Sequence, residues 1–183
     1  MIKENYPSGR QVLTEYDSVG RVAGVKNGGL YYAGAPPTDS ANRIQYAPHG
    51  AISAMKMGNG KWEHTNFNSR LQPTQIGLGT SGTDSSLLRL DYTYNTTGQT
   101  NNNGNMLSQR IVISGSLDVT QSYGYDALNR LSSTSENTGA NWLQNYGYDR
   151  YGNRWVSQST GYDEDPNLCP TQQRVKSAQQ PTA

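Results

Sequence analysis

The fold of this chain is decided by a short motif that occurs four times: EYDSVGRV at 15–22, QYAPHGAI at 45–52, GYDALNRL at 124–131 and GYDRYGNRW at 147–155. Each copy has a tyrosine, usually an aspartate after it, two variable residues, and then Gly or Asn. Two weaker copies fit between them. They are NFNSRL at 66–71, which is interpreted as one residue short in the turn, and TYN at 93–95, whose turn is expanded to GNML at 104–107. Such loosely spaced copies predict a repeat protein.

Each copy of the motif predicts a β-hairpin whose turn follows the aromatic residue. An aspartate at the start of the turn accepts hydrogen bonds from backbone N–H groups two residues on. Gly or Asn at the fourth position after the aromatic supplies a positive φ at little steric cost. We therefore expect positive φ angles at Gly20, Gly50 and Gly152.

The residues that define the repeats are predicted to be structural anchors, with no catalytic, cofactor-binding or metal-binding role. They are Tyr16, Asp17, Gly20, Arg21, Tyr46, Gly50, Phe67, Tyr94, Tyr125, Asp126, Asn129, Arg130, Tyr148, Asp149 and Gly152. The anchor tyrosines are expected to be substantially buried, because aromatic side chains form ladders between neighbouring hairpins. Glu15 and Asp91 are expected to face water.

The composition agrees with an all-β chain of short strands. Only 33% of the residues are hydrophobic and the mean hydropathy is -0.81, which argues against a thick aliphatic core; 13 Tyr stand against one Phe, with 20 Gly and 8 Pro. Tyrosine suits a pleated, half-exposed surface, and the Gly and Pro supply turns. We predict irregular antiparallel hairpins in one curved sheet. About six hairpin units fill residues 1–162, followed by a polar, poorly ordered tail at 163–183.

The net charge and the lack of long apolar segments argue against two classes of partner, nucleic acid and membrane. Fifteen basic and 14 acidic residues give a net charge of +1, which provides no basic field for nucleic acid. The N-terminus MIKENYP has no apolar region of a secretory signal, and no window is apolar enough for a transmembrane helix. We therefore expect no nucleic-acid partner and no membrane span.

The units YDSVGRV, YDALNRL and YDRYGN resemble the YD repeats of Rhs proteins, bacterial insecticidal toxin-complex components and teneurins. The segment YPSGR at 6–10 also resembles the lead-in strand of such repeats, and the resemblance covers about residues 5–160. In that family the hairpins wind into a spiral sheet that encloses a hollow shell, often around a toxic C-terminal domain. The resemblance implies that this chain is a fragment of such a wall, located outside the cell or at its surface. The Pro- and Asp-rich segment that ends such shells is not recognisable in this sequence.

Motifs for chemistry are weak. GLGTSG at 77–82 matches the dinucleotide pattern GxGxxG, but an alternating, strand-like segment follows it where a helix is required, so we interpret residues 77–86 as a Gly-rich loop. His49, His64 and Cys169 lack the paired spacing of metal ligands, and the acidic run at 163–165 is expected to be solvated. Asn95 begins an NTT glycosylation sequon, which matters only in a eukaryotic secretory path.

Three functions remain open at the level of sequence. The first is a structural part of a YD-repeat shell, whose partners are the neighbouring repeats and an encapsulated toxin or effector domain. The second is a surface module that binds a carbohydrate or another ligand, because rows of Tyr can stack on sugar rings. The third is a glycoside hydrolase that uses paired carboxylates such as Asp17, Asp126 and Asp149. Their recurrence once per turn favours a structural role.

Overall fold

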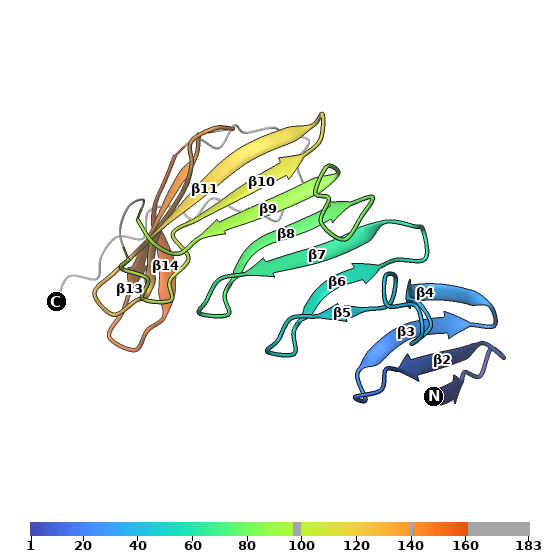
Figure 1. The fold of residues 1–183 in the computed structure, drawn as a ribbon. Coiled ribbons are helices and arrows are strands. Elements are labelled where there is room, and N and C mark those ends of the chain that lie inside the picture. The colour runs from blue at the N-terminus through green and yellow to red at the C-terminus, as the bar shows by residue number, and fades with distance from the viewer. Residues whose placement is uncertain (97–99, 140, 161–183) are drawn as a thin grey trace. The chain divides into compact units, whose positions relative to one another are not determined.

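The chain folds into antiparallel β-hairpins in chain order (Figure 1). The computed structural model describes residues 1–96, 100–139 and 141–160. Contacts divide the chain into two compact units. Unit one comprises Met1–Tyr92 and Ile111–Leu117, and unit two comprises Thr93–Arg110 and the residues from Asp118 onward. The antiparallel all-β prediction is confirmed.

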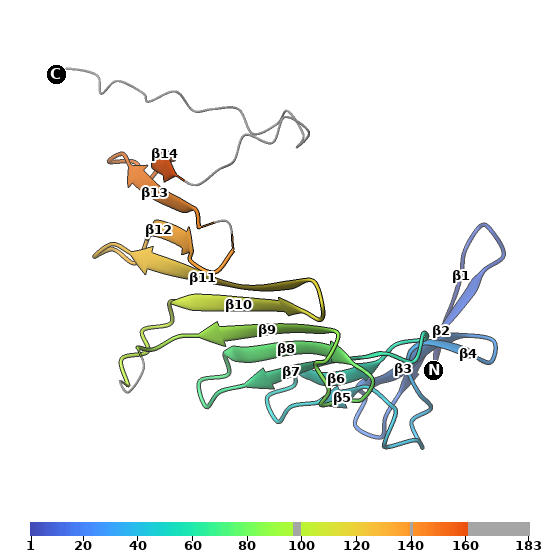
Figure 2. The same cartoon turned by 90° about the horizontal axis from the view of Figure 1, so that it is seen from above.

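Unit one contains two sheets. Strands β1 (Ile2–Asn5), β2 (Gln11–Tyr16), β3 (Val22–Asn27) and β4 (Leu30–Gly34) form the first. Strands β5 (Gln45–Tyr46), β6 (Ile52–Lys56), β7 (Trp62–Phe67), β8 (Pro73–Gly79) and β9 (Leu88–Thr93) follow one another in the second (Figure 2). The prediction of one sheet is therefore wrong for the first four strands. The connection after β4 explains the break, because Pro36 and Pro37 cannot donate to a sheet ladder.

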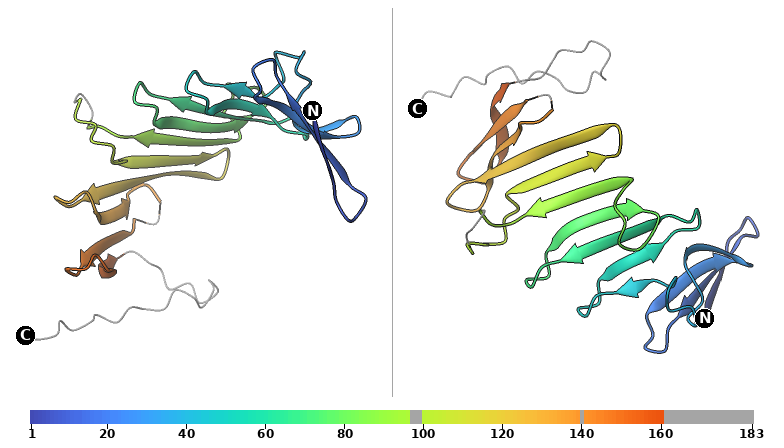
Figure 3. Two further views of the ribbon diagram at one scale, coloured as in Figure 1. Left: turned by 90° about the horizontal axis from the view of Figure 1, so that it is seen from below. Right: turned by 45° about the horizontal axis from the view of Figure 1, so that its top comes forward.

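Unit two contains a second meander. Strands β11 (Leu117–Tyr125), β12 (Leu131–Glu136), β13 (Leu143–Tyr148) and β14 (Arg154–Thr160) pair antiparallel with their sequence neighbours (Figure 3). Strand β10 (Ser108–Ile113), like β9 and β11, has residues assigned to both units. Among the described residues no helix is long and apolar enough to cross a membrane.

The core is thin, as the composition indicates. The buried hydrophobic residues are Ala23, Ala35, Ile44, Ala54, Trp62 and Val119. No large side chain among the described residues is less than 2% exposed. Hydrogen bonds and half-buried aromatic residues must therefore supply much of what holds successive hairpins together.

Gly77 and Gly79 lie in β8, so the prediction of a loop over 77–86 is wrong for residues 77–79. A Cβ on Gly77 would lie 2.2 Å from Cε1 of His64, and one on Gly79 would lie 2.3 Å from the Asp84 carbonyl oxygen. The two glycines therefore make room for a buried ring and for the loop that follows β8. This close packing explains the glycine spacing of GLGTSG without a bound phosphate.

Candidate functional site: the turn and its anchor aromatic

One backbone turn recurs along the chain. The N–H of its first residue donates to the carbonyl of its fifth, and the N–H of its fourth donates to the carbonyl of its first, at 2.7–3.1 Å. The described residues contain seven such turns, beginning at Tyr6, Asp17, Ala47, Met57, Asn68, Asp126 and Asp149. This is the geometry of a type I turn followed by a left-handed residue. The sequence motif thus specifies a defined loop.

The fourth residue of every one of these turns has a positive φ. The angles are 80° at Gly9, 83° at Gly20, 92° at Gly50, 80° at Gly60, 64° at Leu71, 58° at Asn129 and 88° at Gly152. The predictions for Gly20, Gly50 and Gly152 are confirmed. The expectation of a turn one residue short at 66–71 is wrong, because Leu71 occupies the glycine position and Gln72 closes the turn.

Two of the turns have no copy of the full motif. The segment 6–10 resembles a lead-in strand in sequence but forms a turn, and MGNGK at 57–61 has Lys56 in place of an aromatic anchor. Both have Gly at the fourth position and a basic residue at the fifth, a signal that could have revealed them. The anchor aromatic is thus not needed for the turn itself, so its role must lie elsewhere.

The aspartate at the start of the turn holds the loop closed. Oδ1 of Asp126 accepts from the N–H of Leu128 and of Arg130, both at 2.9 Å, and Oδ2 accepts from Nε of Arg130 at 2.7 Å. Asp17 makes the same three contacts with Val19 and Arg21 at 2.9–3.0 Å. One carboxylate therefore holds the turn together and also orients the arginine at its fifth position.

Asp149 repeats the arrangement with an amide instead of a guanidinium. It accepts from the N–H of Tyr151 at 2.8 Å, the N–H of Asn153 at 2.9 Å and Nδ2 of Asn153 at 2.7 Å. Hydrogen bonds from backbone and side chain hold the pKa of Asp17, Asp126 and Asp149 below the usual value. A general acid of a glycosidase needs the opposite shift, so the position of these carboxylates supports a structural role.

The anchor aromatic fastens its repeat to the one before. The Tyr46 hydroxyl donates to the carbonyl oxygen of Val22 at 2.9 Å, and the Arg21 guanidinium lies over its ring, 4.9 Å from the centroid. We call this pair of contacts the anchor lock. It joins the aromatic of one hairpin to the arginine and the first return-strand residue of the preceding turn.

The same lock recurs in unit two. The Tyr148 hydroxyl donates to the Leu131 carbonyl oxygen at 2.7 Å, and the Arg130 guanidinium lies 4.2 Å from the ring centroid. The Tyr125 hydroxyl donates to the Met106 carbonyl oxygen at 2.9 Å. Met106 follows the expanded turn in the place that Val22 and Leu131 occupy in the regular copies, which supports the alignment of that turn with the others.

The anchors are partly buried, which agrees with the prediction that neighbouring hairpins cover much of each ring. Tyr16, Tyr46, Tyr94, Tyr125 and Tyr148 are half-buried, as is Phe67. The rings of Tyr46 and Tyr148 each contact a neighbouring hairpin. Burial raises the pKa of the Tyr46 and Tyr125 hydroxyls, which remain neutral hydrogen-bond donors.

Phe67 is the exception among the anchors, because it has no hydroxyl to donate. Its ring instead meets the ring of His49, which lies in the turn at 47–51, with centroids 4.6 Å apart at 85°. The fifth residue of that turn is Ala51, which has no guanidinium to place over the anchor. The position of the aromatic is kept at this junction while both contacts of the lock are replaced.

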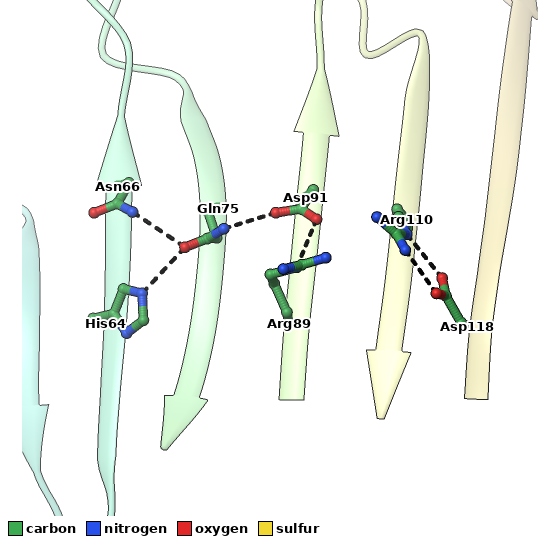
Figure 4. Close-up of polar contacts among 7 residues, drawn as sticks. All are labelled: His64, Asn66, Gln75, Arg89, Asp91, Arg110 and Asp118. Carbon is green, nitrogen blue, oxygen red and sulfur yellow. Dashed lines mark hydrogen bonds and ion pairs between the residues drawn. The ribbon is translucent and has the colours of Figure 1, made fainter. Parts of the chain in front are cut away.

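Polar side chains form a row across β7, β8 and β9 (Figure 4). Oε1 of Gln75 lies 3.3 Å from Nδ2 of Asn66 and 3.4 Å from Nε2 of the buried His64, and Nε2 of Gln75 donates to Asp91 at 2.8 Å. Asp91 also pairs with Arg89 at 2.9 Å. Asp91 is therefore partly enclosed by partners, which contradicts the expectation that it faces water.

Glu15 is a second acidic residue whose surroundings differ from the prediction. It is half-buried, pairs with Nζ of Lys26 at 2.6 Å, and accepts a hydrogen bond from the Tyr31 hydroxyl. These partners lower its pKa. The side chain therefore links β2 to Lys26 of β3 and to Tyr31 of β4. In a separate pair, Arg110 and Asp118 form a bidentate ion pair at 2.8 and 2.6 Å in unit two (Figure 4).

Candidate metal ligands are not brought together in the part of the chain that the structure describes. His64 is buried in the polar row, and His49 is exposed in a turn. Cys169 and the acidic run at 163–165 lie outside the described residues, as do part of the sequon at Asn95 and the predicted tail.

The turn and the anchor lock together define a class of protein: an all-β chain of hairpin repeats in which anchor aromatics such as Tyr46 and Tyr148 contact the preceding turn. No protein-family model and no curated protein sequence matches the chain. Solved structures do. The structure of the Photorhabdus luminescens Tc holotoxin pore matches with a TM-score of 0.65, and the crystal structures of TcdB2-TccC3-TEV and TcdB2-TccC3-Cdc42 match with TM-scores of 0.66 and 0.68.

These matches share 18% sequence identity and cover 86–87% of this chain but only 8% of each matched chain. At that identity they show the fold and nothing finer. The chain is fold-equivalent to a small part of a toxin-complex structure, as its resemblance to toxin-complex components implied.

Proposed function

We propose that this chain is a structural segment of an Rhs-type, YD-repeat shell, which encapsulates or displays a toxin or effector domain and has no catalysis of its own. The observation that carries this proposal is the anchor lock. The lock fastens the repeats that begin at Tyr46 and Tyr148 to the preceding turns, while the turns themselves engage the carboxylates of Asp17, Asp126 and Asp149 in hydrogen bonds. The fold match to toxin-complex structures supports the same function.

A wall built this way depends on its neighbours. At the locked junctions a repeat contributes an aromatic to the repeat before it, which supplies the carbonyl acceptor. The partners of this segment would therefore be further repeats, with the enclosed domain as a second partner. A shell of this kind would act outside the cell or at its surface, which we include in the proposal.

Limited proteolysis tests the proposal. The complete reading frame that contains this chain would be expressed, purified and treated with proteinase K. We expect a segment outside the repeats to survive as a protected fragment and to be cleaved once urea opens the shell. A hollow particle in electron micrographs is expected in parallel.

A matched pair of variants links the protection to this chain. Replacing Tyr46 and Tyr148 by Phe removes two lock hydroxyls and should accelerate cleavage of the protected segment. Tyr151→Phe serves as the control, since Tyr151 is 74% exposed and is not an anchor. A complete protein with no protected segment and no hollow particle would rule out the shell.

A further inference from the structure

A groove of about 560 Å³ lies beside Phe67 in unit one. Its walls come from the turn at 47–51, from β6 and β7, and from the turn at 68–72. Both turns lie at the same end of their strands (Figure 1). The volume falls within the range of roughly 300–1,000 Å³ that is usual for small-molecule sites.

The groove lies where two paired strands, β6 and β7, separate from each other. The pairing of β6 with β7 ends at Ala54 and His64, so Ser53 and Thr65 lie beyond the last pair and line the groove. In unit two the pairing of β12 with β13 likewise ends before the anchor, at Ser133 and Asn145.

The difference between these two separations is chemical. In unit two Tyr148 and Arg130 span the separation. In unit one Phe67 cannot donate, and Ala51 cannot cover the ring. The groove therefore lies beside an anchor aromatic that has no hydroxyl to donate.

The walls have the chemistry of a site for a neutral, hydroxyl-rich molecule. The rings of Tyr46, His49 and Phe67 provide apolar surface, while Ser53 and Thr65 provide hydroxyls. None of the lining residues is a carboxylate, an ammonium or a guanidinium group. A charged ligand would lose its hydration without a paired charge, whereas a neutral one would not.

We propose that this groove binds a neutral oligosaccharide, with a sugar ring against Phe67 and His49. A sugar hydroxyl would occupy the place of the missing tyrosine hydroxyl. The proposal does not depend on the shell function, because the whole groove is built from one unit.

A glycan array of neutral and acidic oligosaccharides tests it with the full chain as the probe. We expect retention of neutral oligosaccharides only. Phe67→Tyr adds the lock hydroxyl and should lower the signal at least tenfold. His49→Ala removes an exposed wall and should do the same; it keeps the test valid should the first variant fail to fold.

Tyr151→Phe is the matched control, since it removes the hydroxyl of an exposed tyrosine that is no anchor and does not line the groove, and it should leave the array signal unchanged. Three results would overturn the proposal: no neutral glycan retained above background, retention of acidic glycans alone, or equal binding by His49→Ala. A protected cargo with no glycan binding would retain the shell and reject the groove.

Discussion

The junctions at Tyr148 and at Phe67 both follow a turn of the same type, but the anchor aromatic contacts the earlier hairpin differently in each. At Tyr148 a hydroxyl reaches the Leu131 carbonyl and the Arg130 guanidinium covers the ring. At Phe67 the ring meets His49 edge to face, and a groove lies alongside. The comparison shows that the turn is formed by its own five residues, whereas contact between two repeats depends on the anchor aromatic.

The largest effect is expected from breaking the stronger junction. Tyr148→Phe leaves the Leu131 carbonyl without its donor, which should cost about 1–3 kcal/mol of local stability. Hydrogen–deuterium exchange of β12 and β13 amides measures the change. Tyr151→Phe in the same unit should have little effect. Unchanged exchange in Tyr148→Phe would show that the hydroxyl contact carries no stability.

Relieving strain in the weaker junction is expected to come next. Leu71 holds a φ of 64° and is 56% exposed. Leu71→Gly should stabilise the β7–β8 hairpin by about 1 kcal/mol, because a left-handed conformation costs a non-glycine residue roughly 1–2 kcal/mol.

Asn129→Gly gives the matched comparison at the same turn position in unit two. Asparagine tolerates positive φ better than leucine does, so the gain should be smaller. Urea unfolding followed by exchange at each hairpin compares the two. A larger gain for Asn129→Gly than for Leu71→Gly would contradict the strain argument.

Converting the weaker junction into the stronger one should give a similar or smaller gain. Phe67→Tyr offers the missing hydroxyl and is expected to slow exchange of β6 and β7 amides by the equivalent of about 0.5–1.5 kcal/mol. A destabilised variant would show that the groove has no place for the hydroxyl.

Of the two contacts in the lock, the arginine–ring contact should contribute less to the free energy of unfolding than the tyrosine hydroxyl does. Arg130→Lys keeps the positive charge but loses both the planar face over Tyr148 and the Nε hydrogen bond to Asp126, with an expected cost of about 0.5–1 kcal/mol. Thermal unfolding measures it, and Arg154→Lys, at a second ring contact in the same unit, is the comparison. A loss larger than that of Tyr148→Phe would show that the guanidinium, and not the hydroxyl, is the stronger half of the lock.

Acid should weaken the turns of the repeats that begin with aspartate. The folded pKa values of Asp17 and Asp126 lie below the unfolded value of about 3.9. Their contribution is therefore fully present above the unfolded pKa and is lost as the pH falls through the folded values. The stability gap between the chain and Asp126→Asn should close below about pH 4, near the unfolded pKa. Parallel pH profiles would exclude this linkage.

Most of the turns can be predicted from the sequence because the hydrogen bonds that form each turn join residues within a five-residue segment. A carboxylate that accepts from N–H groups two and four residues on, and a residue able to adopt positive φ, are both visible in the motif. The position of Leu71 could not be predicted, because leucine is not expected in a left-handed conformation. The turn at 57–61 escaped prediction because no aromatic precedes it.

The fastening between repeats was decided by tertiary structure alone. Tyr46, Tyr125 and Tyr148 all donate to backbone carbonyls, which every residue possesses, so no side chain at Val22, Met106 or Leu131 reveals the acceptor. The burial of His64 against Gly77 also depends on strand register. The amino-acid sequence by itself determined the hairpins, whose hydrogen bonds are local. Which carbonyl, ring or guanidinium each anchor meets required the packing of strands from separate hairpins.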